Sequence, residues 1–359
     1  MAGPVRQPID IPSLEEYITN HAPSISTPLD FGFGQSNPTY LLASPNGHQY
    51  VLRKKPPGKL LSKTAHQVER EYRILHALQE TNVPVPKVYI LCEDDTVIGT
   101  AFYIMEFLDG RVFTDPFMPG VSPVDRKEMW RSALQTLINL HTLSPSALGL
   151  STLGKPTGFY NRQIKTFTSL SRHQATTIDV ETKTPIGPLP HLEQTSSFFT
   201  RNQPADCTSI VHGDYKIDNI IFHKTEPRVI GVLDWEMATL GHPLSDVVSL
   251  VAPFLPHVWG GSALNPGPPP ADIGLPSLDE CLALYATSGY DVRRDLKWGR
   301  AFAGFRGAVI MQGIAARYAV RQASSASAKE FGAMAWPTAE GVWGLVQELK
   351  VEEQEKGKL

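Results

Sequence analysis

The segment that most limits how this chain can fold is 210–222, where polar residues separate two short apolar runs. It reads Ile-Val-His-Gly-Asp-Tyr-Lys-Ile-Asp-Asn-Ile-Ile-Phe. Short apolar runs of this kind are typical of buried strands, so we expect the polar residues to lie on a loop. A further apolar strand, Val229–Leu233, follows and leads into Asp234-Trp235-Glu236. A β-hairpin would bring the two polar segments together.

The first polar segment has the spacing His-x-Asp-x-x-x-x-Asn, formed by His212, Asp214 and Asn219. In phosphoryl-transfer enzymes with this pattern, the Asp accepts the proton of the substrate hydroxyl and the Asn binds a metal ion. We therefore predict that Asp214 is the catalytic base. Asn219 and Asp234 are the predicted ligands of Mg²⁺, which prefers hard oxygen ligands. His212 is more typical of a hydrogen-bonded scaffold residue than of a proton carrier.

The alternative interpretation is that the first segment is an ordinary turn and that Asp234 caps a helix, since Asp is common at both places. Both motifs occur in the order, spacing and strand context that phosphoryl transfer needs, which favours the functional interpretation.

The rest of the chain predicts an α+β fold with two lobes. Asp30–Ala43 and Tyr50–Arg53 read as a hairpin with a glycine-containing bend and a third strand. Apolar residues three or four positions apart predict an amphipathic helix over 65–78. Further predicted elements are strands at Lys87–Cys92 and Ala101–Phe107 and helices beginning at Lys127 and spanning Ala301–Tyr318. The predicted lobes are 1–108, a small antiparallel sheet with one helix, and 109–350, mainly helical. A charged tail follows over 351–359, which we expect to be frayed from Glu352 to Lys358.

If the base and the metal ligands lie in the second lobe, the first lobe must hold the phosphates of the nucleotide. The glycine-containing bend suits this task, because glycine permits close backbone approach and polar donors follow it. Its candidate residues are Gly32, Gly34, Ser36 and Asn37.

The third strand should supply a cation for the α- and β-phosphates, as the strand Lys does in protein kinases. Arg53 is the candidate, and Lys55, on the same strand face, is the alternative. On the predicted helix, Glu71 is the candidate for holding this cation, and Glu69 is its rival.

The segment Tyr103–Phe107 resembles the connection between the lobes of a kinase. Backbone groups of Glu106 and Leu108 would pair there with the adenine edge of ATP.

The motif His212-Gly213-Asp214 with Asn219, followed by Leu233-Asp234-Trp235-Glu236, resembles the aminoglycoside phosphotransferase family of kinase-like enzymes. That family has Gly where protein kinases usually have Arg after the His, and an Asp-Trp-Glu type of sequence in place of Asp-Phe-Gly. The resemblance implies a bilobal protein-kinase-like fold and transfer of the γ-phosphoryl of Mg-ATP to a hydroxyl group of a small molecule. It also suggests that Asp246 braces the catalytic loop, although Asp246 could simply be a helix N-cap.

Within the family the likeness is greatest to kinase-like domains attached to certain acyl-CoA dehydrogenases. It lies in the segments 50–61, Tyr160–Ile164 and Met311–Ile314. Those relatives imply a hydroxylated acyl acceptor as readily as an aminosugar. The segments expected to line the acceptor pocket, Phe159–Arg172 and Ala301–Arg317, are basic and apolar, whereas a polycationic aminoglycoside would call for acidic side chains.

Two other functions remain possible from the sequence. A protein kinase is disfavoured, because the motifs differ and no Ala-Pro-Glu segment follows Asp234. A catalytically silent pseudokinase, acting as a nucleotide-binding or interaction module, fits the Arg at position 53. The presence of Asp214, Asn219 and Asp234 favours an active enzyme.

The composition sets the expected partners and compartment. The 33 basic and 36 acidic residues give a net charge of −3, which predicts neither a nucleic-acid partner nor a membrane partner. Cys92, Cys207 and Cys281 lack paired spacing and read as buried thiols in a reducing compartment. We expect a cytoplasmic protein, with the ending Gly357-Lys358-Leu359 as a faint peroxisomal alternative. The oligomeric state and the choice between ATP and GTP stay open.

Overall fold

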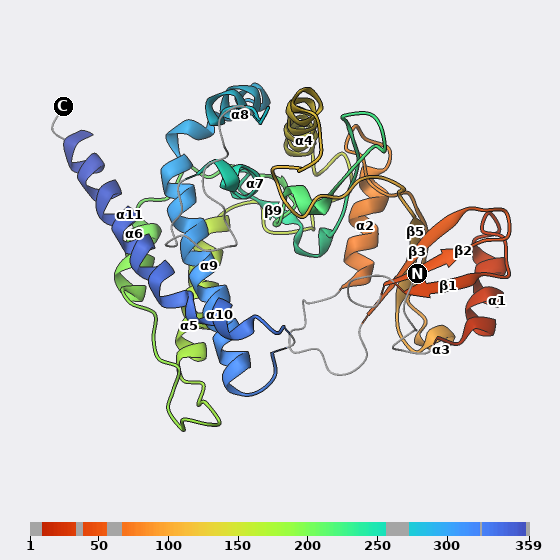
Figure 1. Ribbon diagram of the computed structural model, residues 1–359, viewed down its shortest axis with the longest axis horizontal. Helices are drawn as coiled ribbons and strands as arrows, with labels where there is room; N and C mark the ends of the chain where they lie inside the picture. Colours follow the sequence, from red (N-terminus) through yellow and green to blue (C-terminus); the bar gives the residue numbers. More distant parts are fainter. Residues whose placement is uncertain (1–8, 34–38, 56–66, 256–272, 324, 357–359) are drawn as a thin grey trace. The chain divides into compact units, whose positions relative to one another are not determined.

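The computed structural model describes residues 9–33, 39–55, 67–255, 273–323 and 325–356 (Figure 1). The chain divides into two compact units. The first unit contains Met1–Val121, Glu128–Thr152 and His212–Thr239, and the second contains Ser122–Lys127, Leu153–Val211 and Leu240–Leu359. The two lobes defined from the sequence, 1–108 and 109–350, remain predictions.

Within the described residues, five antiparallel strands form the sheet of the first unit, in the order β1-β2-β3-β5-β4. The predicted hairpin, third strand and two further strands are confirmed. The bounds of the strands are β1 (Asp30–Phe33), β2 (Thr39–Ala43), β3 (Gln49–Lys54), β4 (Val88–Cys92) and β5 (Phe102–Glu106).

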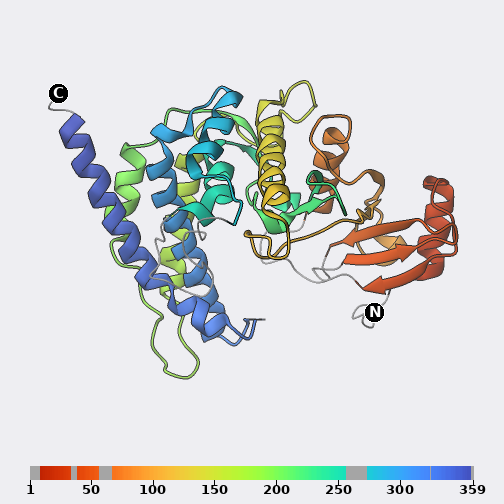
Figure 2. The same ribbon diagram turned by 45° about the horizontal axis from the view of Figure 1, so that its top comes forward.

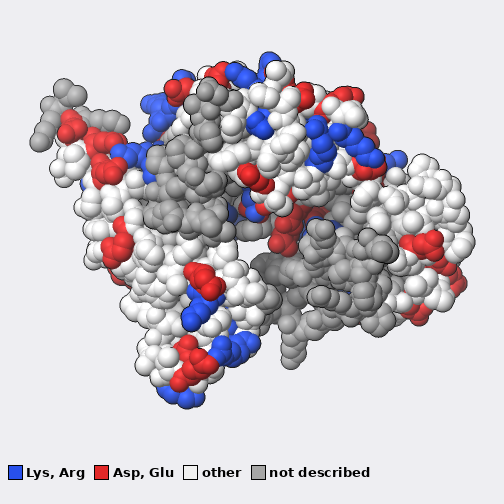
Figure 3. Space-filling view, in the orientation of Figure 1, with Lys and Arg blue, Asp and Glu red and all other residues white. Residues whose placement is uncertain are grey.

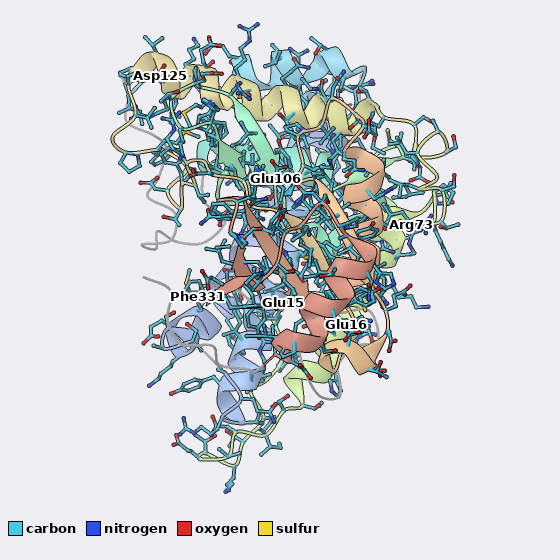
Figure 4. The ribbon with its side chains drawn as sticks, turned by 90° about the vertical axis from the view of Figure 1, so that its right-hand side faces the viewer. Glu15, Glu16, Arg73, Glu106, Asp125 and Phe331 are labelled. Carbon is cyan, nitrogen blue, oxygen red and sulfur yellow. The ribbon has the colours of Figure 1, made fainter. Side chains whose placement is uncertain are left out.

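One face of the sheet packs on α1 (Ile11–His21), a helix that the sequence analysis did not predict. Leu14 and Ile18 of α1 are fully buried against side chains of β2, β3 and β5. The Glu15 carboxylate accepts a hydrogen bond of 2.6 Å from the backbone N–H of Leu29, just before β1. Figure 4 shows α1, with Glu15 and Glu16 labelled, lying across the sheet.

The opposite face of the sheet packs on α2 (Val68–Leu78), the predicted amphipathic helix (Figure 1). Strand alternation places Arg53 of β3 on this face, and Tyr103 of β5 lies directly opposite Arg53 in the register. The Arg70 guanidinium of α2 donates a hydrogen bond of 2.7 Å to the carbonyl of Ala238. The helix is therefore fixed both to the sheet and to the segment that follows Asp234-Trp235-Glu236.

The first unit also contains the predicted hairpin of β7 (Ile220–Phe222) and β8 (Val229–Val232), which pair antiparallel. The Tyr215 hydroxyl, which is buried, donates a hydrogen bond of 2.8 Å to the carbonyl of Ala133 on α4 (Pro123–Thr142). This bond anchors the loop before β7 to the part of α4 that belongs to the same unit.

The second unit is mainly helical, and Figure 2 shows α9 running beside α5 and α11. Its core includes a buried polar contact in which the Ser171 hydroxyl donates to the side-chain carbonyl of Gln312, at 2.7 Å. Its elements are α5 (Phe159–Ala175), α6 (Leu192–Arg201), β6 (Ser209–Val211), β9 (Thr239–Gly241), α7 (Leu244–Val251), α8 (Leu278–Tyr285), α9 (Leu296–Ala319), α10 (Ala328–Ala333) and α11 (Ala335–Lys356).

The prediction of a frayed tail is wrong for its first part, because α11 continues through Lys356. The Lys297 amine lies 3.0 Å from the Glu348 carboxylate and also pairs with Glu352, so one acidic residue of the tail has a cationic partner on α9. The prediction of buried thiols holds for Cys92 and Cys281, whereas Cys207 is only partly buried.

In the part of the chain that the structure describes, none of the helices combines the length and the apolar character needed to span a bilayer. On the face drawn in Figure 3, acidic and basic side chains are interspersed, in keeping with the near-balanced charge of the sequence.

Candidate active site

The β7–β8 hairpin brings together the two polar segments, as the sequence predicts. The backbone N–H of Leu233 donates a hydrogen bond of 2.9 Å to the backbone carbonyl of Asn219. Asp234 is the next residue after Leu233, so it lies close to Asn219. The local strand pairing of Ile220 with Val232 enforces this arrangement.

His212 is fully buried and joins the two segments. Its Nε2 lies 2.8 Å from the carbonyl of Leu233, and its Nδ1 accepts a hydrogen bond of 3.2 Å from the backbone N–H of Asp214. A neutral ring with its proton on Nε2 satisfies both contacts. The Trp235 ring packs edge-on against this imidazole, with the ring centres 4.7 Å apart. His212 thus braces the loop, in keeping with the scaffold role predicted from the sequence.

Gly213 has a φ of +87°, and a Cβ built there would lie 2.8 Å from the carbonyl oxygen of Met237. Both the backbone conformation and the neighbouring backbone therefore require glycine at this position. The left-handed conformation and the close approach explain why this loop carries Gly between the His and the Asp.

We expect Gly213→Ala to reduce the free energy of unfolding by about 3 kcal/mol, from left-handed strain and from displacement of the Met237 backbone. Gly47→Ala is the matched control, because Gly47 has a φ of +84° but nothing within 4 Å of its Cβ position. This control should cost only about 1–2 kcal/mol. Chemical unfolding of both variants measures the difference, and equal losses would show that the contact with Met237 is unimportant.

The side chains of Asp214 and Asn219 are in direct contact. The Asn219 amide nitrogen donates to the backbone carbonyl of Asp214 at 2.8 Å and to Oδ2 of its carboxylate at 3.1 Å. These bonds use the NH₂ group, so the carbonyl oxygen Oδ1 is the atom with which Asn219 could hold a cation.

Lys216 is a component of the site that the sequence analysis missed. Its amine lies 3.3 Å from Oδ2 of Asp214 and 3.3 Å from Oδ2 of Asp218. Burial alone would lower the pKa of Lys216, but the two carboxylates raise it above its usual value, and the amine therefore stays protonated. A lysine between two aspartates of a catalytic-loop pattern was the available signal.

Asp234 has left-handed backbone dihedrals, with φ +65° and ψ +58°, and its side chain is 40% exposed. The Arg53 guanidinium lies 3.7 Å from Oδ1 of Asp234 and 2.9 Å from Oε1 of Glu71. One cation of β3 therefore lies between a buried carboxylate of α2 and the carboxylate at the end of the hairpin.

Burial would lower the pKa of Arg53, but the Glu71 carboxylate raises it above its usual value. Burial also raises the pKa of the Glu71 carboxyl, an effect that Arg53 opposes. The close contact of 2.9 Å supports an ionised pair at neutral pH, because the guanidinium keeps its charge.

The two rival candidates, Lys55 after the strand and Glu69 on the helix, form a second pair, in which the Lys55 amine contacts the Glu69 carboxylate. The structure therefore pairs Arg53 of β3 with Glu71 of α2, and Lys55, which directly follows β3, with Glu69 of α2. Among the described residues, Arg53 contacts Asp234 and Lys55 does not.

The structure describes only some of the remaining predicted nucleotide residues. Gly32 is in β1, while Gly34, Ser36 and Asn37 lie outside the described residues. Glu106, labelled in Figure 4, ends β5, and its backbone N–H donates to the carbonyl of Lys87 at 2.7 Å. Its carbonyl is therefore the backbone group that could pair with adenine. Leu108 packs over Gly231 of β8, where a Cβ would meet its side chain.

All of the candidate site residues that the structure describes belong to the first unit. Asp246 lies instead in the second unit, fully buried in the first turn of α7, and its bracing role stays a prediction. Among the described residues, no group of three or more His, Cys, Asp or Glu side chains could hold a metal ion by itself. A divalent ion held by Asn219 and Asp234 would therefore need oxygen atoms from a second molecule, as Mg²⁺ held with nucleotide phosphates does.

Together, the antiparallel sheet, the paired strand cation and the hairpin loop define the kinase-like class of α+β proteins. Residues 29–266 match the family described as the phosphotransferase enzyme family. A Ralstonia eutropha JMP134 protein named for aminoglycoside phosphotransferases is 38% identical, with a TM-score of 0.81 over 95% of this chain and 99% of that chain. This chain belongs to the phosphotransferase enzyme family, which confirms the predicted family and fold class.

Two further comparisons define the range of similarity. The ADP-bound structure of aminoglycoside phosphotransferase APH(2'')-Ib shares the fold, with 15% identity and a TM-score of 0.59 over 93% of this chain and 99% of that chain. Acyl-CoA dehydrogenase family member 11 of Rattus norvegicus is 38% identical over 338 residues, which are 88% of this chain and 40% of that protein. The chain thus spans about two-fifths of the length of this curated relative.

Proposed function

We propose that this protein is a small-molecule kinase that transfers the γ-phosphoryl group of Mg-ATP to a hydroxyl group of a metabolite. The observation that carries the proposal is that Asp214 and Asn219 precede β7 and Asp234 follows β8 of one β-hairpin, with Arg53 of the same unit 3.7 Å from Asp234. A base, an amide oxygen, a carboxylate and a cation are the groups that phosphoryl transfer requires.

In this mechanism Asp214 accepts the proton of the acceptor hydroxyl, while its contact with Asn219 fixes the orientation of its carboxylate. Arg53 binds the α- and β-phosphates, with Glu71 holding its guanidinium in place. Lys216 lies next to the base and supplies positive charge for the transferring phosphoryl group. Asn219 and Asp234 would hold Mg²⁺, which when bound neutralises phosphate charge.

The adenine-binding part of the proposal rests on the end of β5. The carbonyl of Glu106 and the N–H of Leu108 would pair with the adenine edge, and the glycine-containing bend that begins at Gly32 would cover the phosphates.

For the acceptor we propose a hydroxylated acyl compound rather than an aminoglycoside. A small pocket in the second unit supports this choice, because no acidic side chain is among the described residues that line it. Aromatic rings and a single cation suit an apolar, neutral or anionic molecule. The pocket is lined by Phe159, Tyr160, Gln163, Ser245, Val248, Gly299, Phe302, Ala303 and Arg306. The similarity to a protein named as an acyl-CoA dehydrogenase family member points the same way.

A screen of metabolites with γ-labelled ATP and Mg²⁺ tests the function and identifies the acceptor. We expect label to pass to one hydroxylated compound, and to an acyl compound in preference to any aminoglycoside. Labelling of an aminoglycoside alone would contradict the proposed acceptor. Tight binding of ATP without transfer to any compound would favour the alternative, a pseudokinase.

A further inference from the structure

Tyr103 has a hydroxyl group that neither packing nor any role assigned above explains. The side chain is fully buried in β5, and among the described residues its hydroxyl oxygen has no hydrogen-bond partner. Buried polar groups are nearly always hydrogen-bonded, because leaving one unpaired costs free energy. Phenylalanine would fill the same space without that cost.

The surroundings of this hydroxyl are the charged groups of the proposed nucleotide site. Tyr103 lies directly opposite Arg53 in the β3–β5 register, on the face that packs against α2. Burial raises the pKa of the Glu71 carboxyl, and the Tyr103 hydroxyl is near enough to oppose this shift as a hydrogen-bond donor, although it lies outside the geometry of a full hydrogen bond. Asp234 also lies within electrostatic range of it.

The Glu71 carboxylate needs hydrogen-bond or ion-pair donors from the protein, because its side chain is only 4% exposed to water. Its ion-pair partner is Arg53, at 2.9 Å, and Arg53 also lies 3.7 Å from Asp234. If Arg53 turns toward the phosphates of a nucleotide, it gives up part of its contact with Glu71. A buried carboxylate that loses a donor is costly unless another donor replaces it.

We propose that Tyr103 is a positioning residue whose hydroxyl donates a hydrogen bond to the Glu71 carboxylate when Arg53 engages the phosphates of Mg-ATP. The hydroxyl keeps Glu71, and with it Arg53, in the geometry that binds phosphate. The inference rests on the proposed function, because it assigns Arg53 to the nucleotide.

The test compares the binding of Mg-ATP with the binding of adenosine, which has no phosphates. Tyr103→Phe should weaken Mg-ATP binding about tenfold, the effect of one hydrogen bond to a charged group, and leave adenosine affinity within about twofold. A general disturbance of the sheet would weaken both ligands. Tyr50→Phe is the matched control, because Tyr50 is a buried tyrosine of the same sheet whose side chain belongs to the core on the α1 face. It should change neither affinity.

A double-mutant cycle then tests whether Tyr103 acts through Glu71. In a Glu71→Gln background, which removes the carboxylate charge, Tyr103→Phe should change Mg-ATP affinity by less than about threefold. Binding of Mg-ATP by the parent together with equal effects of Tyr103→Phe in both backgrounds would overturn this inference alone. An unchanged Mg-ATP affinity in Tyr103→Phe would also overturn it. Absence of Mg-ATP binding by the parent would overturn the proposed function as well.

Discussion

Asp214→Asn should lower the rate of phosphoryl transfer by about 10³-fold while Mg-ATP affinity stays within about threefold. The amide has the shape of the carboxylate, and its oxygen can still accept the hydrogen bond from Asn219 that Oδ2 accepts in the parent. It cannot accept a proton from the acceptor hydroxyl. The loop should therefore keep its structure and lose its base. The measurements are the transfer of label from ATP to the acceptor found by the metabolite screen, and the dissociation constant of Mg-ATP.

The matched control for this variant is Asp218→Asn. Asp218 belongs to the same loop, is 39% exposed against 32% for Asp214, and contacts the same Lys216 amine at 3.3 Å. No role in the reaction is assigned to it, so its variant should keep activity within about tenfold of the parent. Similar losses in the two variants would indicate a general electrostatic effect of the loop, and would remove the reason for naming Asp214 as the base.

Asp234→Asn should weaken the binding of Mg-ATP by about 100-fold. Removing a side chain that only orients a metal-binding residue can lower metal affinity by up to about 100-fold, and removing a charged metal-binding carboxylate should lower it at least as much. The substitution suits the backbone, since Asn is among the residues that tolerate the φ of +65° found at this position. Thermal stability should therefore change little.

The diagnostic quantity for Asp234 is the effect of Mg²⁺ on nucleotide affinity. In the parent, Mg²⁺ should strengthen ATP binding, and in Asp234→Asn this gain should nearly disappear. A matched control is Asp109→Asn, which removes an exposed carboxylate of the same unit that pairs with Lys224. A full Mg²⁺ effect in Asp234→Asn would contradict the assignment of Asp234 as a metal ligand.

The hairpin and its motifs were predictable because their determinants are local in the sequence. The apolar runs around Asp214 and before Asp234 define β7 and β8, and the pairing of these strands follows from their short connection. The same locality made the β1–β3 strands and the α2 helix recognisable from period and turn residues.

Contacts between distant elements could not be predicted in the same way. Alternation along β3 restricts the strand cation to Arg53 or Lys55, but the choice of partner on α2 depends on how the helix lies on the sheet. Helix α1 was missed although Asp10 caps its N-terminus, and its place in the fold depends on the burial of Leu14 and Ile18 against the sheet. In the helical tail, Glu352 likewise pairs with Lys297, which is far away in the sequence.

The structure of the protein with Mg²⁺ and a non-hydrolysable ATP analogue tests the proposed site most directly. We predict that the Asn219 side-chain oxygen and the Asp234 carboxylate both coordinate a Mg²⁺ ion that also binds phosphate oxygens, with the Arg53 guanidinium on the α- or β-phosphate. A nucleotide bound away from the β7–β8 hairpin, or a metal ion without Asn219 and Asp234 as ligands, would contradict the proposed function.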